Sequence, residues 1–348
     1  MRALCKLPAL LCVIVLTTAW PLAAAGSPSG VRQFTTASKE RGRDIMVTVW
    51  YPAGPGGKNV TLGESPLFMG TEAMLNAPIA EGQYPVVLLS HGAGLAGTPE
   101  AMSWIAVPLA KQGYVVAAPL HLGNGGIDRS ATETIKLWLR PPDISATLDA
   151  LQGQPFLENH LQLGSVGVLG LSMGGSTALS LAGARIDPSR LANYCDNLAT
   201  NPSLCGWMKQ SGVDLHQMDV TSAGRDNRDG RITFAMAIDP APVDVFEMAS
   251  FQEISIPVEI INLGQPDEIP STALASGVAA AIPAGRYAIL TDANHFSMFG
   301  VCKPDAPTLA KADGIEEPIC SDGSGHTRTK VHQELINATS EALHKWLR

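Results

Sequence analysis

The chain is poor in charged and in aromatic side chains, which make up 16% and 5% of its 348 residues. The charged share lies well below the ~25% of an average soluble protein. Together with 45% hydrophobic residues, this composition favours a well-packed globular fold over disorder. A basic surplus is missing as well, because the formal net charge is −8. We therefore expect no nucleic-acid partner, and a neutral or cationic ligand in preference to an anionic one.

Patterns for bound metals and cofactors are also missing. No group of cysteines and histidines has the spacing of a zinc site. The glycine-rich residues 123–126 follow an apolar run, but they lack the dinucleotide and phosphate-loop patterns. The sequence contains no internal repeat and no low-complexity tract. We expect an activity that needs neither a metal nor a cofactor.

The N-terminus has the pattern of an export signal over residues 1–25. Arg2 and Lys6 precede an uncharged apolar stretch over residues 7–20, and Ala25 ends a run of small residues suited to cleavage. The stretch is barely long enough to span a membrane. We expect a secreted or periplasmic protein with no stable membrane span after signal cleavage.

Four cysteines remain after this cleavage. An even number of cysteines in an exported protein favours two disulfides. Four cysteines allow three pairings, and closeness along the chain favours Cys195–Cys205 and Cys302–Cys320.

Short apolar runs alternate with helical patterns along most of the chain. We expect strands at 44–51, 85–90, 114–119, 166–171, 232–238, 257–263 and 286–290. We expect helices at 98–112, 142–151, 176–182, 271–281 and 328–347. Strands that alternate with helices predict an α/β fold with a mostly parallel central sheet and helices on both faces. We expect one domain over residues 26–348, with a cysteine-bearing insertion at about 187–231 that could form a lid or line the substrate pocket.

The strongest local motif is Gly170-Leu171-Ser172-Met173-Gly174, which directly follows the apolar run at 166–171. A strand, a Gly-x-Ser-x-Gly turn and a helix together form the nucleophile elbow of α/β-hydrolases. The glycines at 170 and 174 remove the Cβ atoms that would clash where strand and helix fold together. Ser172 is the predicted nucleophile.

A serine hydroxyl needs a base, and the base needs a carboxylate that orients it. His295 follows the last predicted strand and is the predicted base. Asp267 and Asp239 each follow a strand and could both serve as the acid, and position alone favours Asp267. The other histidines that follow both Ser172 and the two candidate acids lie in a polar loop or on the C-terminal helix: His326, His332 and His344.

When a serine attacks a carbonyl group, the carbonyl oxygen becomes an oxyanion, and this oxyanion needs two hydrogen-bond donors. The backbone N–H of Met173 is one predicted donor, because it directly follows the nucleophile. The second should come from the loop after the strand at 85–90, and there we expect the N–H of Ala93. His91 in the same loop is expected to be structural.

Five segments together resemble the bacterial α/β-hydrolases related to platelet-activating-factor acetylhydrolase, which are often labelled dienelactone hydrolases. The segments are Val-Trp-Tyr-Pro-Ala at 49–53, Leu-Ser-His-Gly-Ala-Gly at 89–94, Pro-Leu-His at 119–121, Arg-Pro-Pro-Asp-Ile at 140–144 and Gly-Leu-Ser-Met-Gly-Gly at 170–175. The resemblance covers residue 45 to the end, apart from the insertion. It implies a cofactor-free ester hydrolase and supports Ser172, His295, Ala93 and Met173.

The resemblance leaves the acid open. The acetylhydrolase branch places its aspartate at the position of Asp239, whereas related lipases and polyester hydrolases place it at Asp267. True dienelactone hydrolases carry a cysteine nucleophile, and this chain has Ser172 instead.

The sequence therefore predicts a serine hydrolase, carboxylesterase-like or lipase-like, that acts on a small-molecule or lipid ester. The same residues would serve an amidase or a peptidase. A non-catalytic binding protein on a hydrolase scaffold is the alternative from another class, because a fold alone does not prove a function.

Overall fold

The structure is a computed structural model, and it describes residues 28–126, 128–323 and 325–348. The predicted signal segment, residues 1–25, lies outside the described residues. In the part of the chain that is described, no helix is long and apolar enough to cross a membrane.

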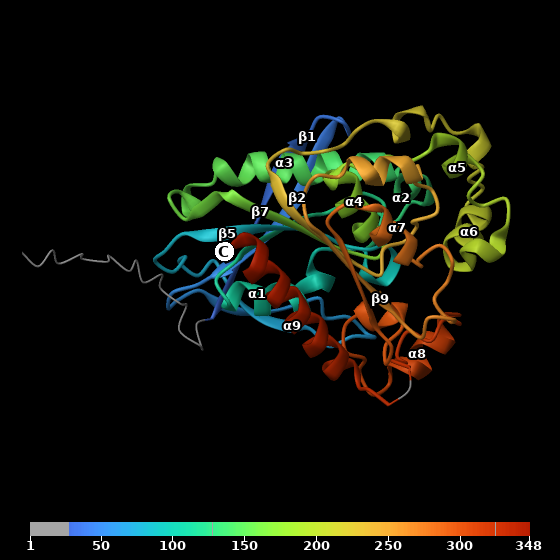
Figure 1. The fold of residues 1–348 in the computed structure, drawn as a ribbon. Coiled ribbons are helices and arrows are strands. Elements are labelled where there is room, and N and C mark those ends of the chain that lie inside the picture. The colour runs from blue at the N-terminus through green and yellow to red at the C-terminus, as the bar shows by residue number, and fades with distance from the viewer. Residues whose placement is uncertain (1–27, 127, 324) are drawn as a thin grey trace, which may run out of the picture.

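A ten-stranded sheet with the order β10-β9-β8-β7-β5-β6-β2-β1-β4-β3 forms the centre of the fold (Figure 1). The strands from β10 to β6 run parallel, β2 is antiparallel to both β6 and β1, β1 is parallel to β4, and β3 is antiparallel to β4. The strands are β1 (Ser29–Ser38), β2 (Arg43–Pro52), β3 (Lys58–Leu62), β4 (Thr71–Leu75), β5 (Tyr84–Ser90), β6 (Val115–Pro119), β7 (Leu161–Leu171), β8 (Ile232–Ile238), β9 (Val258–Leu263) and β10 (Gly285–Leu290). This sheet confirms the predicted α/β-hydrolase architecture.

Helices cover both faces of the sheet (Figure 1). They are α1 (Ser103–Lys111), α2 (Ala131–Ile135), α3 (Arg140–Gln152), α4 (Met173–Ala182), α5 (Pro188–Ala192), α6 (Pro202–Gln210), α7 (Ser276–Ala281), α8 (Ala306–Ala312) and α9 (Arg328–Leu347). Buried side chains of α3, α4 and α7 belong to one core cluster, and those of α1 and α9 belong to a second cluster. The predicted helices over 142–151 and 328–347 match α3 and α9, whereas α1 and α7 are shorter than expected.

The central strands show why their continuous apolar runs are needed. Successive side chains of a strand point to opposite faces of the sheet. In β5, Val86 and Leu88 therefore join the core under α3 and α4, and Val87 and Leu89 join the core under α1 and α9. All four side chains are fully buried. Each such burial stabilises the fold by about 1.5–3 kcal/mol, so both faces must be apolar here.

The N-terminal part of the sheet was not fully predicted. The segment over 53–84, in which we predicted no strand, contains β3 and β4, and β1 precedes them. These three strands alternate exposed and half-buried positions over much of their length, and their apolar runs are weak. Their pairing depends on distant partners, such as the ten-residue register between β1 and β2.

Both favoured cysteine pairs form disulfides, Cys195–Cys205 and Cys302–Cys320. The first disulfide lies in the insertion, which holds α5 and α6 (Figure 1). The insertion is joined to the loop after β9 by a hydrogen bond of 2.5 Å between the hydroxyls of Tyr194 and Thr272.

Candidate active site

Ser172 lies in the sharp turn between β7 and α4. Its backbone has φ +55° and ψ −123°, a conformation that is strained for a residue with a side chain. The turn is held to the end of β8 by a 3.0 Å hydrogen bond from the Ser172 N–H to the Ile238 carbonyl. Gly170 and Gly174 are required here, because a Cβ on either would collide with neighbouring backbone atoms. The strand, turn and helix thus match the predicted nucleophile elbow.

His295 reaches this serine from the loop after β10. It begins a short 3-10 helix, His295–Met298, whose N-cap residue Asn294 forms a reciprocal capping box with Ser297. The Nε2 atom of His295 lies 3.0 Å from the Oγ atom of Ser172. The capped helix therefore holds the imidazole within hydrogen-bond distance of the hydroxyl, as a general base requires.

The carboxylate beside His295 belongs to Asp239, directly after β8. Its Oδ2 atom lies 2.6 Å from His295 Nδ1. Its Oδ1 atom accepts hydrogen bonds from the Asn262 side-chain amide at 2.7 Å and from the Leu263 N–H at 2.9 Å. Asp239 is 1% exposed, and these donors satisfy the buried carboxylate. Asn262 was missed in the sequence, although a polar residue inside the apolar run of β9 is a usable signal.

The preference for Asp267 over Asp239 is therefore corrected. Asp267 lies in an exposed turn four residues beyond the end of β9. Asp239 and not Asp267 lies beside His295 because of the strand order. Strand β8 lies directly beside β7, whereas β9 lies one strand further away. A residue at the end of β8 is thus closer to the turn after β7.

Ala93 and Met173 occupy the two positions expected for oxyanion donors. Met173 is the first residue of α4, and Ala93 lies in the loop after β5, before a short 3-10 helix. A Cβ built on Gly92 would lie 3.3 Å from the Ser172 Cβ, so this loop passes beside the serine. Within the described chain, neither the Ala93 N–H nor the Met173 N–H donates to another protein group.

A second serine, histidine and aspartate are connected behind the site. Ser90 Oγ lies 3.0 Å from His121 Nε2, and His121 Nδ1 lies 2.9 Å from Asp143 Oδ2. All three side chains are fully buried, so no substrate reaches this serine. The guanidinium of Arg41 binds both oxygens of Asp143. Burial lowers the pKa of His121 well below its usual value, which keeps this histidine neutral.

His332 of α9 supports the loop that carries His295. Its Nε2 atom lies 3.1 Å from the carbonyl oxygen of Ser297 and 2.9 Å from that of Phe299. Its ring stacks on Trp104 with the centroids 3.8 Å apart. Burial lowers the pKa of His332 to about 3. The folded protein therefore holds this histidine in its neutral form at neutral pH.

We expect acid to destabilise the fold through His332. Its pKa is about 3 when folded and ~6.5 when unfolded, so the unfolded chain binds the extra proton between these pH values. His332 alone should lower the free energy of unfolding by about 1.4 kcal/mol for each pH unit below about 6, until about pH 3. Urea unfolding of the wild type and of His332→Gln at several pH values measures this slope. The variant should show a shallower slope, and equal slopes would contradict the assignment.

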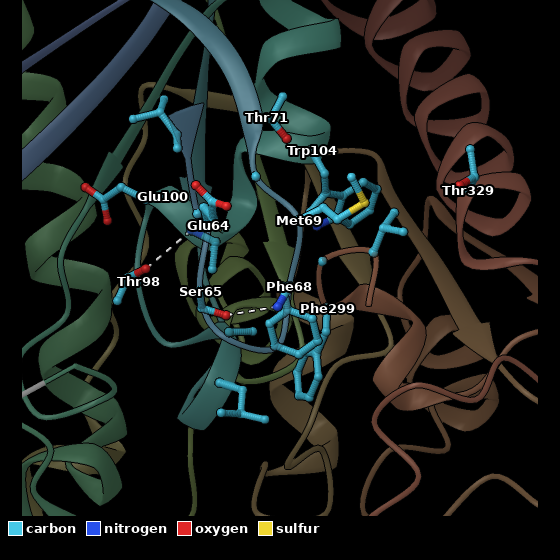
Figure 2. A pocket seen from close by; sticks show the side chains of 18 residues that line it. Glu64, Ser65, Phe68, Met69, Thr71, Thr98, Glu100, Trp104, Phe299 and Thr329 are labelled. Atoms are coloured by element: carbon cyan, nitrogen blue, oxygen red, sulfur yellow. Dashed lines mark hydrogen bonds between the residues drawn. The ribbon is translucent and has the colours of Figure 1, made fainter. Parts of the chain in front are cut away.

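A cavity of about 590 Å³ lies next to the loops that carry Ala93 and His295. Leu95 and Ala96 line it directly after the first loop, and Phe299 lines it after the second. Figure 2 shows the aromatic rings of Phe68, Trp104 and Phe299 with the carboxylates of Glu64 and Glu100 among the lining side chains. The cavity has the size of a small-molecule site. The segment over 53–84 contributes to its wall, whereas the insertion, which was expected to form a lid or line the substrate pocket, does not.

Among the described residues, no group of three or more histidine, cysteine, aspartate or glutamate side chains could hold a metal ion.

Two solved structures share the fold. A ferulic acid esterase from Streptomyces cinnamoneus is 17% identical, with 95% of this chain and 92% of that chain covered at a TM-score of 0.60. A dienelactone hydrolase from Anabaena variabilis is 14% identical, with 92% of this chain and 100% of that chain covered at a TM-score of 0.51. The protein has an α/β-hydrolase fold.

A family model gives a more particular likeness. The model described as platelet-activating factor acetylhydrolase, isoform II, matches residues 60–141, which carry β5, the Ala93 loop and the start of α3. The resemblance noted in the sequence is confirmed over this segment. No curated protein matches the sequence.

Proposed function

We propose that the protein is an exported serine hydrolase that cleaves carboxylic esters. The proposal rests on the hydrogen-bonded series from Ser172 Oγ to His295 Nε2 and from His295 Nδ1 to Asp239 Oδ2, at 3.0 and 2.6 Å. The matches to an acetylhydrolase family model and to two hydrolase structures support it. The two disulfides are compatible with an oxidising compartment outside the cytoplasm.

The reaction has two halves. Ser172 Oγ attacks the ester carbonyl carbon while His295 Nε2 takes the hydroxyl proton, and the side chain of Asp239 stabilises the imidazolium. The amides of Ala93 and Met173 hold the oxyanion. The C–O bond to the alcohol breaks as His295 returns the proton to the leaving oxygen, which leaves an acyl group on Ser172. Water, deprotonated by His295, then attacks this acyl-enzyme, the acid is released and Ser172 regains its proton.

We expect one organic arm of the ester to enter the cavity whose wall includes Leu95 and Ala96 after the Ala93 loop and Phe299 after the His295 loop. Its aromatic and apolar lining suits hydrocarbon, and the carboxylates of Glu64 and Glu100 disfavour an anionic group. A short-chain p-nitrophenyl ester is therefore a suitable first substrate.

The proposed function is tested by combining turnover with covalent labelling. The purified protein should hydrolyse p-nitrophenyl acetate or butyrate and should react with a fluorophosphonate, whose phosphorus bonds to Ser172 Oγ as fluoride leaves. Peptide mass spectrometry should find the adduct on Ser172 alone. Turnover should fall in proportion to the fraction of the protein that is labelled. The matching p-nitroanilide tests for amidase activity. An adduct on another residue that left turnover intact would refute the assignment, and failure to cleave any ester would refute the function.

A further inference from the structure

His91 is fully buried behind the loop that carries Ala93. Its Nε2 atom accepts a 3.1 Å hydrogen bond from the backbone N–H of His121, and its Nδ1 atom lies 2.8 Å from the Gly92 carbonyl oxygen. A ring nitrogen that accepts an N–H carries no proton, so the proton of the neutral ring is on Nδ1. The imidazole therefore donates to the Gly92 carbonyl and has one defined tautomer.

This hydrogen bond orients the peptide bond between Gly92 and Ala93. The peptide unit is planar and trans, so its C=O and its N–H point in opposite directions. Because His91 holds the Gly92 carbonyl on the buried side, the Ala93 N–H points away from His91. The same peptide passes beside Ser172, as the 3.3 Å separation from a built Gly92 Cβ shows. His91 thus sets the direction of one oxyanion donor.

Arg140, the first residue of α3, contacts the same loop from the interior. Its guanidinium donates to the His91 carbonyl, to Thr177 Oγ1 at 2.9 Å and to Asn124 Oδ1 at 2.6 Å. Burial lowers the pKa of Arg140 to about 9, which still leaves the group charged at neutral pH. These hydrogen bonds are therefore charge-assisted and strong.

The acceptors of Arg140 lead to the peptide units that directly follow both predicted oxyanion donors. Thr177 Oγ1 donates to the Met173 carbonyl at 3.1 Å, one turn earlier in α4. The backbone carbonyl of Asn124 accepts the N–H of Gly94 at 2.8 Å, directly after Ala93. One buried guanidinium thus connects the start of α4 with the loop after β5.

On the basis of the proposed esterase function, we infer that His91 and Arg140 are positioning residues that align the Ala93 and Met173 amides into one oxyanion hole. The two donors come from different loops, and each must lie about 2.7–3.1 Å from the oxyanion. A misplacement of about 1 Å can cost about 10²-fold in rate. A connection between the loops that does not touch the substrate therefore controls the rate of the chemical step.

Two variants of His91 separate its two hydrogen bonds. In His91→Asn, the amide nitrogen replaces Nδ1 and can still donate to the Gly92 carbonyl. In His91→Gln, the amide oxygen reaches the place of Nε2 and can accept from the His121 N–H, while the bond to Gly92 is lost. We expect kcat within about threefold of wild type for Asn and about 10–100-fold lower for Gln, with KM changed by less than about threefold in both.

A second pair of variants tests the connection through Thr177. Thr177→Ser keeps the hydroxyl that joins Arg140 to Met173, whereas Thr177→Val keeps the shape and removes the hydroxyl. We expect the serine variant to retain kcat within about threefold and the valine variant to lose about 10–100-fold, again in kcat and not in KM. This pair decides the question if the His91 variants fail to fold.

The inhibition constant of an alkylboronic acid is a measurement that would not change if His91 and Thr177 had a purely structural role. Its tetrahedral adduct on Ser172 places an oxygen at the oxyanion position, so its inhibition constant should rise in the Gln and Val variants in parallel with the loss of kcat. The thermal midpoint is measured for all four variants. If the wild type is active and kcat is equal within each pair, this inference is overturned while the proposed function stands. A wild type without ester turnover would refute the proposed function and this inference together.

Discussion

Replacing Asp239 by Asn should lower kcat for ester hydrolysis by about 10⁴-fold. The Asn262 amide and the Leu263 N–H both donate to the Oδ1 atom of Asp239. They would hold the carbonyl oxygen of the new amide on their side and turn its NH₂ group toward His295. The NH₂ group would donate to His295 Nδ1, so the ring proton would move to Nε2. Steady-state kinetics with a p-nitrophenyl ester measures this loss.

The matched control is Asp267→Asn, which removes the same charge from an exposed turn. Its kcat should stay within about twofold of wild type, because Asp267 is not the carboxylate hydrogen-bonded to His295. The reverse result, with a large loss for Asp267→Asn and a mild loss for Asp239→Asn, would contradict the arrangement of the site. Circular dichroism of both variants checks that each protein is folded.

Replacing Ser172 by Ala should lower kcat by about 10⁶-fold, because no nucleophile would remain for the acyl-enzyme route. Residual catalysis of about 10³–10⁴-fold over water is expected from the two amides and from substrate binding. The measurement is single-turnover and steady-state hydrolysis of a short-chain ester, with fluorophosphonate labelling in parallel. Labelling should be abolished together with turnover.

A suitable control for this variant is Ser211→Ala, an exposed serine at the end of α6. It should keep both full activity and full labelling. Turnover by Ser172→Ala within tenfold of the wild type would show that another group attacks the ester, and the proposed mechanism would then be abandoned.

From the sequence, Ser172 and His295 were expected to meet, and the structure brings them together. The sequence did not distinguish which carboxylate, Asp239 or Asp267, lies beside His295. Ser172 could be located because an apolar strand and a Gly-x-Ser-x-Gly turn are local patterns. His295 follows a strand and is carried to Ser172, as expected. Asp239 and Asp267 both follow strands, so their local patterns are equivalent. Only the lateral order of β7, β8 and β9 distinguishes them, and that order depends on contacts between distant segments.

The buried hydrogen bonds that connect Ser90, His121 and Asp143 could not be predicted from the sequence, for a different physical reason. In the sequence, His121, Arg140 and Asp143 stand in two of the segments that carry the resemblance, but nothing in the sequence shows which groups they contact. Their burial follows from the close packing of α3 against β5 and β6, which removes them from water. Buried polar groups must then satisfy one another, and the partners are set by the packing and not by spacing in the sequence.

The backbone of the site also bears on how this protein could be made more stable. Four described residues other than glycine have positive φ, and two of them, Ser172 and Asp239, belong to the hydrogen-bonded series proposed for catalysis. Each such conformation costs of the order of 1–3 kcal/mol. Glycine at either position would relieve this cost and end catalysis by the proposed route. Activity and stability are thus in direct opposition at these two residues, so thermostable variants have to be sought elsewhere in the fold.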